Sequence, residues 1–283
     1  MIRERLRKSL GLAVLITSLL TLGGALTSLA IAAEKRSAID PLEDIQEFAF
    51  GAGEQMKFDV GWNGIPAARL EVSAQFEMKD GRPVFRYVGS GQTLPYVRLF
   101  YTSEEYVESV LDVGTLSPLR YHIKRTEKGS LRTTTMVGKD GVFQARRVTP
   151  NSDTEHEVEA PGSFDPFSVI YMARSLPLEV GETYTLGLVD GRERYQLTLE
   201  VEAREVVRVK AGTFDALRIR PELVNLDDPG EEGKGRVRKV RLWLTNDRYR
   251  VPVRMESDLT FGRVYGELTS FTRGNALRFS RAD

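Results

Sequence analysis

Cysteine is absent from the 283-residue chain, and histidine occurs only twice, as His122 and His156. A chain without thiols has no disulfide, no thiol nucleophile and no cysteine for lipid attachment at a processed N-terminus. Two histidines fall short of the three or four His, Cys or carboxylate ligands that zinc usually takes. We therefore expect neither a metal nor a cofactor, and a fold held together by its core alone.

An excess of charge of either sign is also missing, because 40 basic residues balance 40 acidic ones. No long basic run stands out after the N-terminus. Non-specific nucleic-acid binding needs a basic face. We therefore expect no nucleic-acid partner.

The N-terminus has the order of an export signal. Four basic residues within the first eight precede the uncharged residues 10–33, and Ala30-Ile31-Ala32 supplies a small-x-small site. This order predicts a Sec-type signal peptide over residues 1–32 and a product in the periplasm, not stably anchored to a membrane. The alternative is an uncleaved anchor, since residues 10–33 are long enough to span a bilayer.

Alternation of apolar and polar residues dominates the rest of the chain. It is strongest at residues 55–62 and 68–78, where the second run is long for a globular strand. We predict about a dozen strands with short, antiparallel connections in one β-rich domain, residues 54–272. Residues 33–53 are expected to be a flexible lead-in and residues 273–283 a frayed tail. The expected fold is all-β, with an antiparallel curved sheet forming a barrel or half-barrel.

Turns and helices are predicted from local signals. Asp80-Gly81, Asp140-Gly141 and Asp190-Gly191 each separate alternating segments. The dipeptide suits the two central residues of a type I′ turn, which need positive φ. Two short helices are expected: residues 94–101, and a second that begins with Asp165 as N-cap and Pro166 as first residue and ends at Pro177. Both must pack on the sheet.

Catalytic motifs are lacking. No serine has glycine on both sides at the spacing of a nucleophile elbow, and neither a Walker A loop nor a dinucleotide fingerprint is present. A bend or bulge accounts for Gly89-Ser90-Gly91. A pair of carboxylates would be a rival site for an enzyme on envelope glycans, with Asp165 and Asp247 as weak candidates because each also fits a cap or a turn.

Aromatic residues gather in the two expected helices and in two strands. Core packing explains them most simply. The functional alternative is an apolar ligand site under a helical lid. The candidates for lining it are Trp62, Tyr96, Phe100, Tyr101, Phe167, Tyr171 and Trp243.

Four ordered motifs carry a resemblance to a known family. They lie at residues 58–68, 165–184, 211–219 and 242–254, and they include Asp165-Pro166-Phe167 and Leu242-Trp243-Leu244. Together they resemble the exported bacterial family known as domain of unknown function 3108, over roughly residues 53–271. That resemblance implies a Gram-negative periplasmic, mostly antiparallel β protein without accepted catalytic residues. A weaker, fold-level likeness links the pattern to the half-barrels of periplasmic lipoprotein carriers.

These observations predict a non-enzymatic periplasmic binding or envelope-assembly protein. It would hold an apolar ligand, such as an acyl chain, or a partner segment against a curved sheet. The alternatives are the carboxylate-dependent enzyme and a scaffold that docks another envelope protein.

Overall fold

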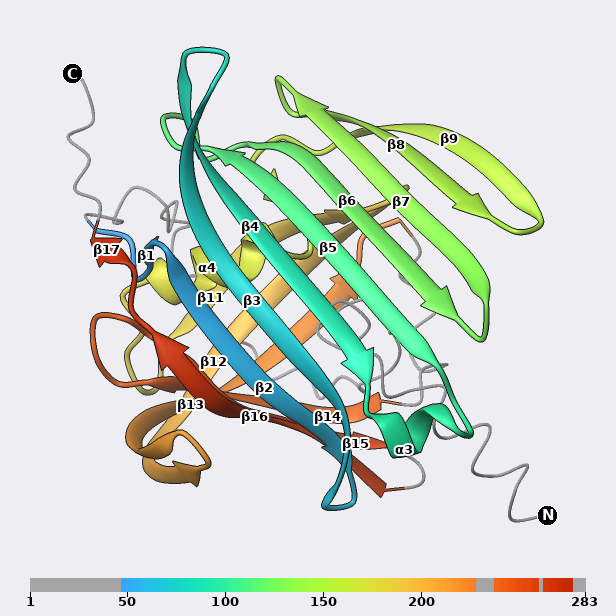
Figure 1. Ribbon diagram of the computed structural model, residues 1–283. Helices are drawn as coiled ribbons and strands as arrows, with labels where there is room; N and C mark the ends of the chain where they lie inside the picture. The colour runs from blue at the N-terminus through green and yellow to red at the C-terminus, as the bar shows by residue number, and fades with distance from the viewer. Residues whose placement is uncertain (1–46, 228–236, 260–261, 277–283) are drawn as a thin grey trace.

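The computed structural model describes residues 47–227, 237–259 and 262–276 and consists mainly of one curved β-sheet with two short helices (Figure 1). Within these residues the sheet has fifteen strands, in the order β10 to β16 followed by β2 to β9. Sequence neighbours therefore pair, and the pairing of β16 with β2 joins the two halves of the chain. The ends of this order, β9 and β10, do not pair with each other, so the predicted all-β fold is confirmed in its half-barrel form.

The bounds of the elements follow the predicted alternation. The strands are β1 (Gly51–Ala52), β2 (Glu54–Trp62), β3 (Ile65–Lys79), β4 (Arg82–Thr93), β5 (Ser103–Asp112), β6 (Pro118–Glu127), β7 (Ser130–Lys139), β8 (Val142–Thr149), β9 (Ser152–Glu159), β10 (Ser163–Phe164), β11 (Thr183–Asp190), β12 (Glu193–Val209), β13 (Gly212–Asn225), β14 (Val237–Thr245), β15 (Pro252–Leu259), β16 (Gly262–Thr272) and β17 (Asn275–Ala276). All pairs are antiparallel except β10 with β11, which is parallel.

Two of the three Asp-Gly turns form as predicted. Asp80-Gly81 and Asp140-Gly141 are the two-residue loops of their hairpins, and all four residues have positive φ. The prediction for Asp190-Gly191 is wrong. Asp190 pairs with Glu193, so the loop is Gly191-Arg192, with positive φ at Gly191 only. Asp190 is thus the last residue of β11, and strand geometry fixes the direction of its side chain.

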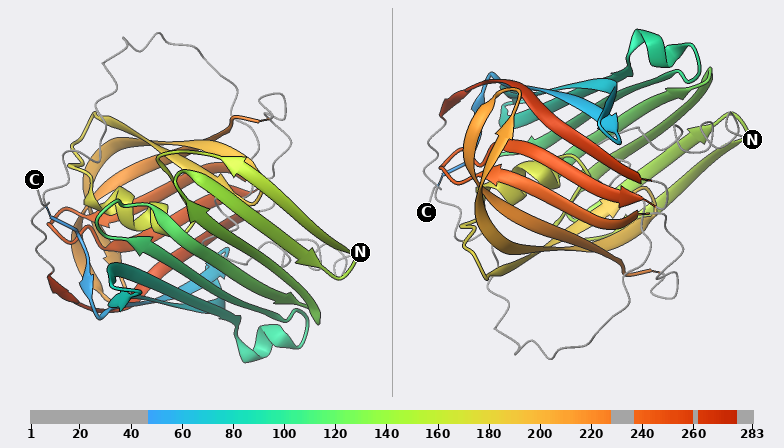
Figure 2. Two further views of the ribbon diagram at one scale, coloured as in Figure 1. Left: turned by 90° about the horizontal axis from the view of Figure 1, so that it is seen from above. Right: turned by 90° about the horizontal axis from the view of Figure 1, so that it is seen from below.

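The core lies on one face of the sheet, here called the inner face. Cross-strand register places Phe58, Leu70 and Gly91 side by side on β2, β3 and β4, and alternate residues of each strand share that face. Helix α4 (Ser168–Ser175) lies inside the curve of the sheet and contacts β5 and β11 (Figure 2). A Cβ atom at Gly89 would lie 2.8 Å from Cγ1 of Val107 on β5 and 3.1 Å from Cζ of Phe167, the residue before α4. No bulge occurs at Gly89, so the close approach of Val107 and Phe167, not the expected bulge, explains the glycine.

Helix α3 (Pro95–Arg98) is shorter than the predicted helix over residues 94–101.

The expected lead-in and tail also need correction. Phe48 and Phe50 pack in the core, and β1 pairs with β17 at Gly51–Ala276, so residues 48–53 and 275–276 belong to the fold. The predicted signal peptide, residues 1–32, lies outside the described residues. None of the helices in the described part of the chain is long and apolar enough to cross a membrane.

Candidate ligand-binding face

Asp165 fixes the start of α4 inside the sheet. Its Oδ1 accepts hydrogen bonds from the backbone N–H groups of Phe167 and Ser168, at 2.9 and 3.0 Å, as the predicted N-cap would. Its Oδ2 accepts from the hydroxyls of Ser109 and Ser168. Burial raises the pKa of Asp165, although these hydrogen bonds oppose the shift. The carboxyl group is therefore fully used by the fold.

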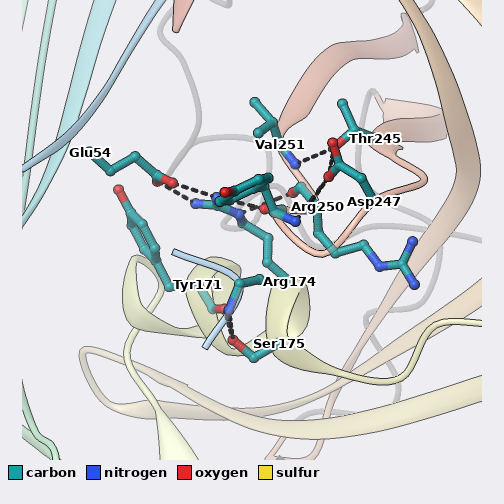
Figure 3. A network of polar contacts seen from close by, with 10 residues as sticks. Glu54, Tyr171, Arg174, Ser175, Thr245, Asp247, Arg250 and Val251 are labelled. Atoms are coloured by element: carbon teal, nitrogen blue, oxygen red, sulfur yellow. Dashed lines mark hydrogen bonds and ion pairs between the residues drawn. The ribbon is translucent and has the colours of Figure 1, made fainter. Parts of the chain in front are cut away.

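A buried ion pair holds the other end of α4 (Figure 3). Arg174 donates from Nη1 and Nη2 to the two carboxylate oxygens of Glu54 on β2, at 2.7 and 2.9 Å, and both side chains are 1% exposed. Arg174 also donates to the carbonyl oxygens of Tyr249 and Arg250 in the β14–β15 loop. Burial alone would lower the pKa of Arg174, but the charge of Glu54 raises it. These contacts connect α4 to both halves of the sheet.

Aromatic rings fill the space between α4 and the sheet. Tyr171 stacks on Tyr87 of β4 with ring centroids 3.9 Å apart, and Phe50 meets Tyr171 edge to face at 5.0 Å. Phe167 completes the group, 5.9 Å from Tyr171. All four side chains are buried. The two predicted site residues of this helix, Phe167 and Tyr171, are therefore brought together as core, and they line no open surface.

The other five predicted site residues are dispersed. Trp62 is half-buried on the inner face at the end of β2, next to Val264. Trp243 is buried on the opposite face from Leu242 and Leu244. Tyr96 and Phe100 are exposed around α3, whereas Tyr101 is buried beneath it, which raises its pKa to about 12. Helix α3 is thus no lid over the inner face, and only Trp62 keeps the predicted position.

A set of apolar side chains on the inner face remains partly exposed. Register shows that its members lie on the same face as the core: Leu242 opposes Met255, and Leu223 opposes Leu197. They come from β2, β6 and β13 to β15, away from the rings packed on α4. We call this set the apolar strip; its members are Trp62, Ile123, Leu223, Leu242, Met255 and Leu259. Nearby on β15, the buried hydroxyl of Ser257 has no hydrogen-bond partner among the described residues.

Charged and hydroxyl side chains from both ends of the sheet also meet on the inner face. We call Tyr121, Arg125, Arg147, Asp190 and Glu193 the polar cluster. Burial raises the pKa of Asp190 to about 6, Arg147 and Arg125 oppose the shift, and Glu193 adds to it. The carboxylate of Asp190 makes no hydrogen bond or ion pair within the described part of the chain.

The strands that supply this cluster are close in space although they are distant in the sheet order. The backbone N–H of Gly191, in the β11–β12 turn, lies 3.2 Å from Sδ of Met136 on β7. Arg125 forms a 2.6 Å ion pair with Glu105 of β5. The β11–β12 turn therefore contacts β7, although the two lie far apart in the order of the sheet.

The carboxylate pair weighed for an enzyme does not form. Asp165 is fully buried at the start of α4, whereas Asp247 is exposed in the β14–β15 loop. Asp247 accepts hydrogen bonds from the hydroxyl of Thr245 and the backbone N–H of Tyr249, as a turn residue does. No group of three or more metal-ligating side chains occurs among the residues the structure covers. Nδ1 of His122 is 2.8 Å from the hydroxyl of Thr135.

Sequence reasoning missed Glu54 and Asp190, and for Asp190 a signal was present. The alternation through Tyr184, Leu186 and Leu188 continues to residue 190, which places its side chain on the core face. The turn assignment at Asp190-Gly191 concealed this. Glu54 is the first residue of the predicted domain, and nothing in the sequence shows that a distant arginine neutralises its charge.

Comparison with known proteins identifies a family and a fold. The sequence profile of the family described as "Protein of unknown function (DUF3108)" matches residues 57–269. No curated protein matches the chain. A β-barrel-like protein of domain of unknown function DUF1849 from Brucella abortus has a similar structure, with a TM-score of 0.51, 9% identity, and coverage of 80% of this chain and 99% of that one. A candidate lipoprotein from Parabacteroides distasonis covers the same shares at a TM-score of 0.33 and 10% identity.

Proposed function

We propose that this chain, which belongs to the DUF3108 family of proteins of unknown function, is an exported, non-enzymatic binding protein for an apolar ligand. The ligand lies on the inner face of the unclosed sheet. The observation that carries the proposal is the apolar strip: inner-face side chains that stay partly exposed although the sheet curves around them. Water-exposed apolar surface on a concave face is what a hydrophobic ligand covers.

The shape of the strip favours a long ligand such as an acyl chain. Its members are spread over strands β2, β6 and β13 to β15, so a compact ligand would cover only part of it. Burial of apolar surface contributes about 25 cal/mol per Å². A chain of methylene groups matches such a surface without leaving polar atoms unpaired. The polar cluster lies on the same face and offers contacts for a polar end.

A second candidate function is binding of a partner protein that adds its own strand to the unpaired edge of the sheet, and this function is less well supported. Strand β9 forms one end of the sheet, and its alternate residues Asp153, Glu155, Glu157 and Glu159 carry a row of negative charge. Charged residues on an edge strand oppose pairing with another chain. The inner face is therefore the better candidate for binding than the edge.

The compartment is inferred from the sequence. The basic residues, the uncharged stretch 10–33 and Ala30-Ile31-Ala32 support export to the periplasm, where the ligand would come from the cell envelope. A carrier or an assembly factor would act there without an anchor once residues 1–32 are removed.

Titration with a fluorescent fatty acid tests the proposal on protein recovered after export. We expect saturable uptake by the wild type and roughly tenfold weaker uptake by Leu242→Gln and Leu223→Gln, because each places an amide on the strip. Val137→Gln, an exposed apolar residue on the outer side of β7, is the matched control and should bind like the wild type. Failure of the wild type to take up the probe, or equal uptake by the strip variants, would overturn the proposal.

A further inference from the structure

Four large apolar side chains are exposed together around α3. The exposed fractions are 79% for Leu99, 73% for Phe100, 50% for Tyr96 and 58% for Ile65, the first residue of β3. The helix is joined to the start of β3, because the hydroxyl of Tyr96 donates to the carbonyl oxygen of Pro66. We call Ile65, Tyr96, Leu99 and Phe100 the α3 patch.

The backbone holds the α3 patch outward. Val97 and Tyr101, four residues apart, share the side of the helix that is buried against the sheet, so Leu99 and Phe100 point away from it. The N–H groups of Phe100 and Tyr101 both donate to the carbonyl oxygen of Val97, at 2.9 and 2.8 Å. Exposure of these side chains is therefore a built feature of the fold and carries a cost in water.

Positive charge lies beside the α3 patch. Nζ of Lys128 is 5.1 Å from the ring centroid of Tyr101, and Lys128 makes no ion pair within the described residues. Arg98 is next to Leu99, with its charge balanced by Glu104 at 3.2 Å. Lys124, further along β6, is also exposed and unpaired within the same residues. Glu127 also acts on Tyr101, so the positive charge that this region offers to an anionic surface comes from the exposed Lys128 and Lys124.

We infer that the α3 patch docks the protein on an anionic bilayer surface. Leu99 and Phe100 project from the connection between β4 and β5. A bilayer can close around such a projection, whereas a protein would need a matching hollow. Aromatic and aliphatic side chains next to lysine are typical of segments that lie at the membrane interface. The inference does not rest on the proposed ligand, because docking and uptake are measured separately.

A site-specific label tests the inference, and the lack of cysteine makes the label unique. Protein recovered after export would carry Leu99→Cys with an environment-sensitive fluorophore; Val206→Cys, at another residue that is 73% exposed, is the matched control. Vesicles of phosphatidylethanolamine and phosphatidylglycerol should shift the emission of the label at position 99 to the blue and leave position 206 unchanged. No shift at position 99, or an equal shift at both, would overturn the inference.

Unlabelled variants measure how tightly the protein binds to vesicles. In vesicle flotation, the double variant Leu99→Ser with Phe100→Ser should bind at least about tenfold more weakly than the wild type, and Val206→Ser should bind equally. Lys128→Gln should weaken binding to these vesicles, with little change on phosphatidylcholine alone. Equal flotation of the double variant and the wild type would contradict docking through the patch. A wild type that floats with neither vesicle but dimerises through these residues would assign the patch to a second copy of the chain.

Discussion

Asp190 is the residue on which pH should act. Its pKa is raised by burial to about 6 from an ordinary value of 3.8, so the folded protein holds a proton that the unfolded chain has released between these values. The free energy of unfolding should therefore fall as the pH rises from about 4 to about 6, by up to about 3 kcal/mol. Urea unfolding of Asp190→Asn should lack this fall.

The control for that experiment is an exposed carboxylate with the opposite shift. Hydrogen bonding to Arg146 lowers the pKa of Asp153, so Asp153→Asn should keep the fall between pH 4 and pH 6. The same pH profile in the wild type and in Asp190→Asn would contradict the assignment of this titration to Asp190.

The ion pair of Glu54 and Arg174 should dominate stability at the level of single side chains. Arg174→Met leaves the carboxylate of Glu54 buried without a partner, which typically costs about 3–5 kcal/mol. The double variant Glu54→Leu with Arg174→Met removes both charges and should recover much of that loss. Denaturant unfolding measures all three proteins, and Arg146→Ala, which breaks the exposed pair with Asp153, should unfold at nearly the same denaturant concentration as the wild type. A double variant no more stable than Arg174→Met would refute the account.

Asp190 and the pair of Glu54 and Arg174 show which features of single residues can be predicted from the sequence and which cannot. The alternation that ends at Asp190 predicts the face on which its side chain lies. The pairing of Glu54 with Arg174 joins residues 120 positions apart, and no local pattern encodes which distant charge meets which. The register of strands that are far apart in the chain determines such contacts.

At the scale of the element, the start of α4 offers a test of whether Asp165 serves structure or chemistry. Asp165→Asn keeps an acceptor for the N–H groups of Phe167 and Ser168, and its amide can donate to the two serine hydroxyls. We expect Asp165→Asn to lose less than about 1 kcal/mol and Asp165→Ala about 2 kcal/mol or more, measured by thermal or urea unfolding. Equal losses would show that the hydrogen bonds of this side chain do not support the helix.

The two helices differ in how well the sequence predicted them. The cap and the proline at Asp165-Pro166 predict the start of the second helix two residues before its first residue, Ser168, because capping depends on local backbone groups. The short aromatic helix after Pro95 is expected to pack on the sheet. Only Val97 and Tyr101 do so, because a single turn cannot bury residues on opposite sides. Local patterns thus predict where a helix begins more reliably than which of its side chains pack against the sheet.

At the scale of the whole molecule, the alternating segments correctly indicate one antiparallel sheet. The alternation does not distinguish a closed barrel from a half-barrel with β9 and β10 unpaired, since closure depends on the twist and packing of the complete sheet. The contact of Gly191 with Met136 and the polar cluster arise from that packing. The sequence therefore predicts an apolar binding face on a curved sheet, but it does not predict which polar residues lie on that face.

Export of the whole molecule leads to a prediction about its N-terminus. Cleavage after Ala32 should leave Ala33 as the first residue of protein recovered from the periplasm, because Ala30-Ile31-Ala32 provides the recognition site. Intact-mass spectrometry of the purified protein measures this directly. A mass that retains residues 1–32, with the protein in the membrane fraction, would show that residues 10–33 serve as an anchor.

The central claim, that the inner face holds an apolar ligand, is tested most directly by native mass spectrometry of protein purified from its own periplasm. We predict a bound adduct that organic extraction releases as a lipid or another long apolar molecule, and a weaker adduct in Leu242→Gln. A spectrum of ligand-free protein, together with no uptake of the fluorescent fatty acid, would contradict the claim.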